Sequence, residues 1–363
     1  MYMGKVLHYF ASGNTAHGFQ SLFDSNLAGL EHIYILIGGP GTGKSTMMKK
    51  IGNLFEEQGQ DVEYLHCSAD PHSLDGVLIR GLSLGIVDGT VPHVLEPIAP
   101  GAIEQYVNLG KAWDSSILKE NKEEIIEMNS QIAQLYQEGY AAFREALAIH
   151  DDWEKIFIAH LDFNKMNDMT EELKEELFGS HHMDKESTVK HRFLGAATPY
   201  GAVDHVPNLT EEITRRYFIK GRPGSGKSTM LKKFAAEAEY RGLNVEVYHC
   251  GFDHNSLDMI IVRELGFAIF DSTAPHEYFP NRDGDSIVDV YERAIEPGTD
   301  ERYSDELKTI SSAYKNKMQE ATAYLHQAKS LHDKIEKIYF TAMDFTVVDE
   351  IYNELLQEIE QLS

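Results

Sequence analysis

Two stretches of the chain combine closely spaced glycines with a lysine and hydroxyl residues. They are Gly38-Gly39-Pro40-Gly41-Thr42-Gly43-Lys44-Ser45-Thr46 and Gly221-Arg222-Pro223-Gly224-Ser225-Gly226-Lys227-Ser228-Thr229. Glycines let a backbone turn tightly, so that several N–H groups point at one anion. A lysine adds positive charge, and a serine hydroxyl is a suitable ligand for Mg²⁺. The chemistry that this combination serves is the binding of a phosphate chain.

The flanking residues indicate that each stretch connects a strand to a helix. The apolar run 33–37 precedes the first stretch and the run 217–220 precedes the second, while residues 47–51 begin a helix after the first. Strand, loop and helix in this order fit the Walker A pattern G-x-x-x-x-G-K-S/T of a P-loop, with the positive end of the helix dipole at the phosphates. In a P-loop, Lys44 and Lys227 reach the β- and γ-phosphates. We therefore predict two nucleotide sites.

The two stretches belong to an internal duplication. At the offset of 183 residues that separates Lys44 from Lys227, many other residues recur. The matched pairs include His66-Cys67 with His249-Cys250, Asp70 with Asp253, Arg80 with Arg263, and Asp88 with Asp271. A match over this length is typical of a repeated domain rather than a short solenoid repeat. The sequence therefore predicts two P-loop NTPase domains, residues 1–185 and 186–363.

We expect an α/β fold in which each domain has a parallel sheet flanked by helices. Strands are predicted at 5–10, 62–66 and 82–87, with echoes at 190–194, 245–249 and 265–270. Helices are predicted at 44–58 and from Ser73 onward. The segments 11–15 and 195–199 are rich in turn-forming residues and are predicted as turns, with a loop near the nucleotide base as the alternative.

The third predicted strand of each half ends in an aspartate. This is the Walker B arrangement, in which Asp88 and Asp271 hold Mg²⁺ together with the hydroxyls of Ser45 and Ser228. The next residues are Gly89 and Ser272, where many hydrolytic P-loop ATPases have a glutamate that activates water. The base would then be Asp70 or a group from another domain or a partner, and the missing glutamate also fits a kinase.

Other repeated residues lie just past the predicted strand ends. Asp70 and Asp253 are candidates for positioning water, a substrate hydroxyl or Mg²⁺, with capping of a following helix as the alternative. His66 and Cys67, with His93 at the neighbouring strand end, are of metal-binding types, but their spacing matches no zinc template and a buried cysteine is more often just packed. The predicted catalytic residues are Lys44, Asp70, Asp88, Lys227, Asp253 and Asp271.

Arg80 and Arg263 have an open role. One half of a tandem duplication could supply an arginine to the other half's phosphate site, as an arginine finger does. The alternative is a structural ion pair within each half.

Each half also carries a helical appendage, at about 115–178 and 302–362, where apolar residues recur at helical spacing. The segments 155–158 and 337–340 fit either a strand or a helix. The appendage is a lid over the nucleotide, the contact between the halves, or a solvated helical hairpin that covers a sheet edge.

The composition and charge of the chain argue against several classes of protein. The 363 residues carry a net charge of −25, which disfavours binding to a nucleic-acid backbone or an anionic membrane surface. The sequence has no run of roughly 18 apolar residues that would span a membrane. The N-terminal residues lack a signal-peptide core, and the two cysteines occupy equivalent positions in the halves, so we predict a protein of the reducing cytoplasm.

The two G-K-S-T loops, the repeated His-Cys-x-x-Asp-x-x-Ser-Leu-Asp segments and the repeated Asp-x-Thr-x-Pro-His segments resemble a bacterial family of tandem P-loop proteins. These proteins are usually described as ATPases or as nucleotide-kinase-like. The resemblance covers essentially the whole chain and implies ATP binding, without specifying an acceptor or a protein partner. An Asn-Lys-x-Asp guanine signature is not evident, because residues 164–167 lack the aspartate, so we prefer adenine.

The sequence thus favours a tandem NTPase that binds Mg-ATP and hydrolyses it to drive a conformational change between its halves. One alternative is a kinase that transfers the γ-phosphate to a small molecule. Another is a nucleotide-sensing interaction protein with negligible turnover.

Overall fold

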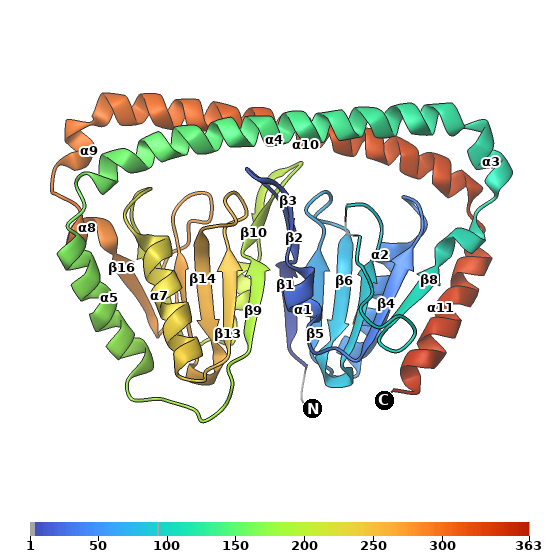
Figure 1. The fold of residues 1–363 in the computed structure, drawn as a ribbon, viewed down its shortest axis with the longest axis horizontal. Helices are drawn as coiled ribbons and strands as arrows, with labels where there is room; N and C mark the ends of the chain where they lie inside the picture. The colour runs from blue at the N-terminus through green and yellow to red at the C-terminus, as the bar shows by residue number, and fades with distance from the viewer. Residues whose placement is uncertain (1–3, 93, 363) are drawn as a thin grey trace.

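The computed structural model describes residues 4–92 and 94–362. Its centre is a mixed sheet of twelve strands flanked by helices, so the fold is α/β (Figure 1). Each half of the chain contributes six strands. The halves meet where β1 (Val6–Phe10) and β9 (Val189–Phe193) pair antiparallel through Phe10 and Phe193. One sheet therefore runs through both halves.

The order of strands is the same on either side of this central pair. From the centre outward, the first half has β1, β5 (Val62–His66), β6 (Leu74–Ile79), β7 (Leu84–Asp88), β4 (His32–Ile37) and β8 (Glu104–Asn108). The second half has β9, β13 (Val245–His249), β14 (Leu257–Val262), β15 (Phe267–Asp271), β12 (Arg215–Lys220) and β16 (Asp285–Asp289). The equal order is the spatial counterpart of the repeat in the sequence.

The expectation of a parallel sheet is wrong, because β6 and β14 run antiparallel to both of their neighbours. The helix predicted from Ser73 onward is likewise wrong, since β6 begins at Leu74. All six residues of β6 are buried, as befits a short apolar run inside a sheet. Only residues 67–73 connect β5 to β6, which is too short for the crossover that a parallel neighbour needs.

The segments predicted as turns at 11–15 and 195–199 contain strands. β2 (Ser12–Thr15) pairs with β3 (Gly18–Ser21), and β10 (Gly195–Thr198) pairs with β11 (Gly201–Asp204). Turn-forming residues are present because each pair closes a tight hairpin, whose glycines Gly18 and Gly201 have positive φ values.

The helices at the glycine-rich stretches begin as predicted, at the two lysines. They are α2 (Lys44–Glu57) and α7 (Lys227–Tyr240). The shorter helices are α1 (Phe23–Leu27), α3 (Ser115–Glu120), α6 (Val206–Leu209), α8 (Val290–Ala294) and α9 (Thr299–Arg302). Three 3₁₀ turns complete the elements, η1 (Arg80–Leu82), η2 (Leu109–Ala112) and η3 (Arg263–Leu265).

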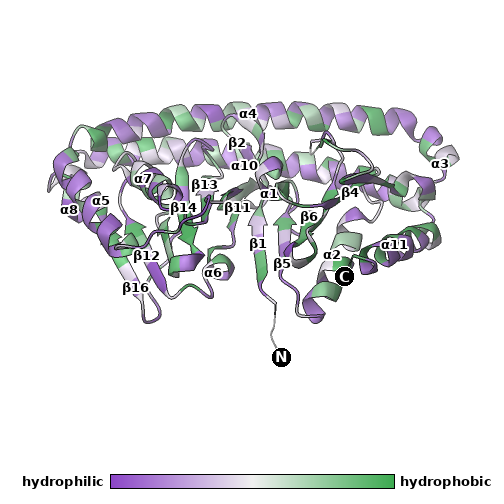
Figure 2. Cartoon of the chain, turned by 60° about the horizontal axis from the view of Figure 1, so that its bottom comes forward, coloured by the Kyte–Doolittle hydropathy of each residue, from purple (hydrophilic) through white to green (hydrophobic). Residues whose placement is uncertain are grey.

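Two long helices cross both halves above the ends of the strands (Figure 1). They are α4 (Lys122–Ile158) and α10 (Ser304–Ala342), and they lie antiparallel to each other, with Lys317 Nζ 2.7 Å from Glu145 Oε2. Hydrophilic and hydrophobic residues alternate along α4 (Figure 2). Below α4, the Tyr140 hydroxyl donates to Asn14 Oδ1 in β2 at 2.9 Å. The helical appendages are therefore a contact between the halves, and segments 155–158 and 337–340 are helical.

The last helix of each half packs against the other half. α5 (Phe163–Phe178) packs into the core of the second half, where Met166, Met169 and Leu173 join residues of α7 and β12. α11 (Phe345–Glu360) packs on the first half, where Val348 and Leu355 join residues of α2 and β4. The boundary at 185/186 stays a prediction of where the repeats divide in sequence, while in space each repeat is completed by the other's terminal helix.

None of the helices in the described chain has the length and apolar character that a membrane span needs.

Candidate functional site

The two glycine-rich stretches adopt the same backbone conformation. We name residues 38–45 the first glycine loop and residues 221–228 the second glycine loop. Gly41 and Gly43 have φ values of +68° and +92°, and their counterparts Gly224 and Gly226 have +75° and +90°. These left-handed conformations favour glycine. Each loop leaves the end of a strand and leads directly into α2 or α7, so both loops present a helix N-terminus.

The interior of each loop is tight and polar. A Cβ at Gly38 would lie 2.8 Å from Thr42 Oγ1, and one at Gly221 would lie 2.7 Å from Ser225 Oγ. Thr42 Oγ1 donates to the Gly39 carbonyl at 2.9 Å. Ser225 is 1% exposed, and its Oγ has no hydrogen-bond partner among the described residues. The Ser225 hydroxyl is therefore a buried polar group whose hydrogen-bonding capacity no described residue uses.

The structure brings each predicted lysine to its predicted aspartate. Lys44 Nζ lies 3.6 Å from Asp88 Oδ2, and Lys227 Nζ lies 3.4 Å from Asp271 Oδ2. The Lys44 ammonium donates to the carbonyl oxygens of Gly38 and Gly39 at 2.9 and 3.0 Å. The Lys227 ammonium donates to the Arg222 carbonyl at 3.1 Å. Both ammonium groups are therefore held between the backbone of their own loop and the aspartate.

The hydroxyls and aspartates predicted to hold Mg²⁺ are fixed by backbone contacts. Ser45 Oγ and Ser228 Oγ accept hydrogen bonds from the Leu74 and Leu257 N–H groups, at 3.0 and 2.9 Å. Asp88 Oδ1 accepts from the Thr90 N–H and hydroxyl, and Asp271 Oδ1 accepts in the same way from Thr273. In both halves the second carboxylate oxygen faces the lysine.

Asp70 and Asp253 close a turn and cap no helix. Asp70 accepts from the His72 N–H and the Ser73 hydroxyl, and Asp253 accepts from the Asn255 N–H and the Ser256 hydroxyl. Burial alone would raise the pKa of Asp70, but Lys329 on α10 and the hydrogen bonds of the turn lower it. The Lys329 ammonium lies 3.4 Å from Asp70 Oδ2, so a residue of the second half reaches the first site.

A further carboxylate, which sequence reasoning missed, lies on the neighbouring strand of each half. Asp75 and Asp258 stand near the starts of β6 and β14, and Asp75 is 3% exposed. Burial, and then the charge of Asp271, raise the pKa of Asp258 to about 6. The sequence signal for this carboxylate is an acidic residue that recurs inside the largely apolar runs Leu74–Ile79 and Leu257–Val262.

Each glycine loop is covered by a long helix that comes from the other repeat. A Cβ at Gly39 would lie 2.3 Å from the Tyr339 ring, and one at Gly41 would lie 2.9 Å from the Glu336 carbonyl oxygen on α10. In the second loop, a Cβ at Gly224 would lie 2.5 Å from the Glu154 carbonyl oxygen on α4. Only glycine leaves room for these helices.

The covering turns carry a repeated group of titratable side chains. His332, Asp333 and Glu336 lie together on α10, as do His150, Asp151 and Glu154 on α4. Burial lowers the pKa of both histidines, and the charges of Lys44 and Lys227 contribute to the lowering at His332 and His150 respectively. The segment His-Asp-x-x-Glu-Lys-Ile recurs at the offset of 182 residues between His150 and His332. This repeat is the sequence signal for the group.

The arginines have structural partners. Arg80 pairs with Glu63 at 2.9 Å and Arg263 pairs with Glu246 at 2.6 Å, so both form ion pairs away from the glycine loops. Arg222 pairs with Asp300 at 2.7 Å. The structure therefore favours the ion-pair alternative for Arg80 and Arg263.

The metal alternative for His66 and Cys67 gains no support. His66 uses one ring nitrogen with His8 and the other with the Pro71 carbonyl, at 2.9 and 3.1 Å. Burial raises the pKa of Cys67 well above its usual range. Neither residue joins a group of three potential metal ligands in the part of the chain described, and His93 lies outside that part.

No protein-family model, no curated protein and no solved structure matches the chain. A function is therefore inferred from the two glycine loops and the groups that surround them.

Proposed function

We propose that the chain binds Mg-ATP at both glycine loops and hydrolyses it to change the contact between its halves. One observation carries the proposal. Each loop is built by the backbone of one repeat and is covered by the long helix of the other, as Glu336 at Gly41 and Glu154 at Gly224 demonstrate. A ligand that enters a loop must therefore act on both repeats.

The first step is recognition of phosphate. Backbone N–H groups at a helix N-terminus, with glycines in the left-handed region beside them, are a general means of binding an anion. Lys44 and Lys227 supply positive charge, and phosphate oxygens would replace the loop carbonyls as acceptors for their ammonium groups. The Ser225 hydroxyl, which has no hydrogen-bond partner among the residues that the structure describes, would donate to the same ligand.

The donor set near each lysine suits Mg²⁺, which prefers hydroxyl, carboxylate and phosphate oxygens. Ser45 with Asp88, and Ser228 with Asp271, would hold it, with the Asp88 carboxylate turning from the Lys44 ammonium to the ion. When bound, Mg²⁺ neutralises phosphate charge and orients the terminal phosphate. Asp70 and Asp253, each held in a turn beside its loop, would orient the attacking water.

The second step is transmission between the halves. The turns of α10 and α4 that cover the loops carry Asp333 with Glu336, and Asp151 with Glu154. These carboxylates repel a triphosphate, so its arrival and its cleavage change the preferred position of the helix. Because α4 and α10 pack along each other, displacement at one loop reaches the other.

The test is release of ADP from Mg-ATP by the purified chain without an added acceptor. Turnover at the altered loop should fall at least about tenfold in Lys44→Ala or Lys227→Ala, and total turnover should vanish in the double variant, because each lysine stabilises phosphate charge. The matched control is Lys50→Ala, on α2 but paired outside the loop with Asp349.

Other outcomes assign the alternatives. ADP release that appears only with a small hydroxyl or phosphate acceptor would identify a kinase. Tight ATP binding without any product would identify a nucleotide sensor. Turnover that survives in the double variant would contradict the proposal.

A further inference from the structure

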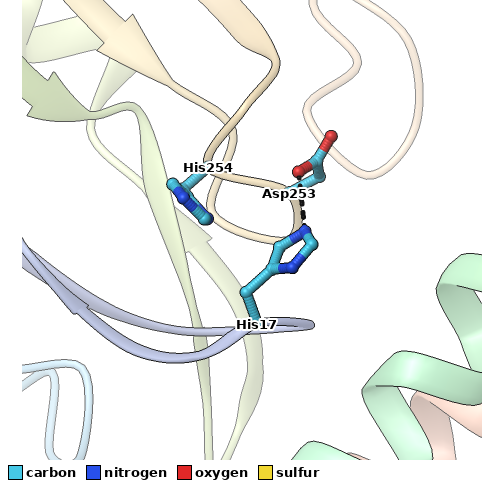
Figure 3. Close-up of side chains that lie close together, drawn as sticks. All are labelled: His17, Asp253 and His254. Carbon is cyan, nitrogen blue, oxygen red and sulfur yellow. Dashed lines mark hydrogen bonds and ion pairs between the residues drawn. The ribbon is translucent and has the colours of Figure 1, made fainter.

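Three potential metal ligands from opposite halves meet beside the second glycine loop. They are His17 in the β2–β3 hairpin of the first half, and Asp253 and His254 in the turn before β14 (Figure 3). His17 Nε2 lies 3.2 Å from Asp253 Oδ1, and one ligand atom from each residue lies within 4.8 Å of the others. With metal–nitrogen bonds of about 2.1 Å, two ligands of one ion are at most about 4 Å apart, so only a small closure is needed.

Backbone contacts hold the histidine of the first half in this position. The Ala16 N–H donates to the Phe252 carbonyl at 2.9 Å, which fixes the tip of the hairpin against the turn that carries Asp253. The His17 N–H donates to Thr15 Oγ1 at 3.1 Å, and Gly18 turns the chain with a φ of +93°. The His17 side chain is 39% exposed and that of Asp253 is 22% exposed, so an ion can reach them.

The equivalent aspartate of the first half, Asp70, has a different positively charged neighbour. Asp70 is paired with Lys329 of α10 at 3.4 Å. At the offset of 182 that relates the helices, the residue of α4 equivalent to Lys329 is Leu147, so α4 offers no ammonium group to Asp253 at that position. At the equivalent positions around Asp70, the first site has Tyr200 and Pro71 in place of His17 and His254. Asp70 is thus paired with a lysine ammonium group, whereas Asp253 lies beside the imidazole rings of His17 and His254.

His254 is available as a ligand. Its Nδ1 is buried and has no hydrogen-bond partner among the described residues. Its ring stands edge-on to that of His17, with centroids 5.0 Å apart.

We propose that His17, Asp253 and His254 bind one divalent first-row transition metal ion of the Zn²⁺ class. Two imidazoles and a carboxylate suit such ions, and water or a further ligand would complete the coordination. The ion links the hairpin of the first half to the turn beside the second loop, where Ser228 Oγ accepts from Leu257 N–H. It makes the two loops unequal, because the equivalent site at Asp70 has Tyr200 and Pro71 in place of the two histidines. The metal site does not depend on nucleotide binding.

The test uses the untagged full chain, stripped with a chelator and free of nucleotide. Titration with Co²⁺, followed by its visible absorption, should show one site per chain with imidazole ligation, and Zn²⁺ should displace the Co²⁺. His17→Ala and His254→Ala should each weaken Co²⁺ binding at least about 100-fold. Circular dichroism should show that both variants are folded, because each residue lies in a surface turn.

Matched variants decide the location. His72→Ala alters the first-half counterpart of Asn255 and should leave Co²⁺ binding unchanged. His150→Ala should also leave it unchanged, because the α4 group is a separate cluster. Zn²⁺ should raise the melting temperature of the unaltered chain and leave that of His17→Ala unchanged. The proposal is overturned if the folded chain binds no Co²⁺, or if His150→Ala abolishes binding while His17→Ala preserves it.

Discussion

At the scale of the residue, Gly224 and Gly29 have similar φ values, +75° and +82°, but different surroundings. A Cβ at Gly224 would lie 2.5 Å from the Glu154 carbonyl oxygen, whereas nothing lies within 4 Å of one at Gly29. Gly29→Ala should cost about 1 kcal/mol of unfolding free energy, from backbone strain alone. Gly224→Ala should cost about 1–3 kcal/mol more, because α4 must move. Urea denaturation measures both, and equal costs would show that α4 does not press on the loop.

Buried Glu63 gives the fold a dependence on acid. Burial alone would raise the pKa of Glu63, but Arg192 and Arg80 hold it well below its usual range. The folded pKa is thus lower than the unfolded value of about 4.3, so the carboxylate stabilises the fold above pH 4.3 and this contribution is lost as the pH falls. Unfolding free energy should fall by up to about 1.4 kcal/mol per pH unit between pH 4 and 3 on account of Glu63.

The comparison for this prediction is Glu63→Gln, followed by urea denaturation at each pH. The variant should be less stable at pH 7 and should lose less stability between pH 4 and 3. Equal slopes in the two proteins would mean that Glu63 does not carry the acid dependence.

The sequence predicted part of the site at this scale. The spacing of residues within the first glycine loop points to Lys44 and Ser45, and the internal repeat points to Asp88 and Asp271. The structure brings these two aspartates to the lysines. The contacts of Asp70 and Asp253 could not be read from the sequence, because His17 lies 236 residues from Asp253. Such contacts depend on how the hairpins and long helices pack, and no local pattern specifies that packing.

At the scale of the element, apolar runs and their ends predict several strands and the longer helices, but not the hairpins β2–β3 and β10–β11 or the outer strands β8 and β16. β5 and β13 have the predicted bounds, and α2 begins at Lys44. A further error lies at β6 and β14, where a six-residue, largely apolar run fits a strand or a buried helix equally well. The short connection from β5 to β6 favours a strand, because it fits an antiparallel neighbour and is too short for the crossover of the expected parallel sheet.

The exchange of terminal helices makes a reciprocal prediction. Leu355 of α11 packs in the first half and Leu173 of α5 packs in the second, and they are 3% and 8% exposed. Either Leu→Ala change should cost about 2–5 kcal/mol by leaving a cavity. In hydrogen–deuterium exchange, Leu355→Ala should speed exchange in α2 and β4 of the first half, and Leu173→Ala should speed it in α7 and β12.

The two leucines occupy equivalent positions, so each variant is the control for the other. If each change instead loosened the half in which its leucine lies by sequence, the exchange of helices would be wrong.

At the scale of the whole molecule, a single arginine joins the halves at the middle of the sheet. Arg192 of β9 lies 3.1 Å from Glu63 and 3.2 Å from Glu246, and its side chain is 2% exposed. Tyr9 stands at the equivalent position in the first half, and its ring lies 4.1 Å from the Arg192 guanidinium. Two equivalent glutamates therefore share one central cation.

Arg192→Met should lower the unfolding free energy by about 3–5 kcal/mol, because it leaves two buried carboxylates short of a partner. Urea denaturation measures the loss. Arg293→Met is the control, since Arg293 pairs with Glu172 where both side chains are largely exposed, and it should cost at most about 1 kcal/mol. A similar cost for both variants would exclude a central role for Arg192.

The continuous sheet and the crossed helices together connect the two glycine loops. The sheet joins the halves at β1 and β9, and α4 and α10 each extend from one repeat to the loop of the other. In this arrangement each loop is in contact with both repeats. The proposed function therefore requires that both loops bind the same ligand.

The most direct measurement is calorimetric titration of the chain with a non-hydrolysable Mg-ATP analogue. We predict two sites in the unaltered chain, one in Lys44→Ala, one in Lys227→Ala and none in the double variant, with Lys50→Ala retaining both. A folded chain that binds no analogue, or binding that persists in the double variant, would contradict the assignment of the glycine loops as nucleotide sites.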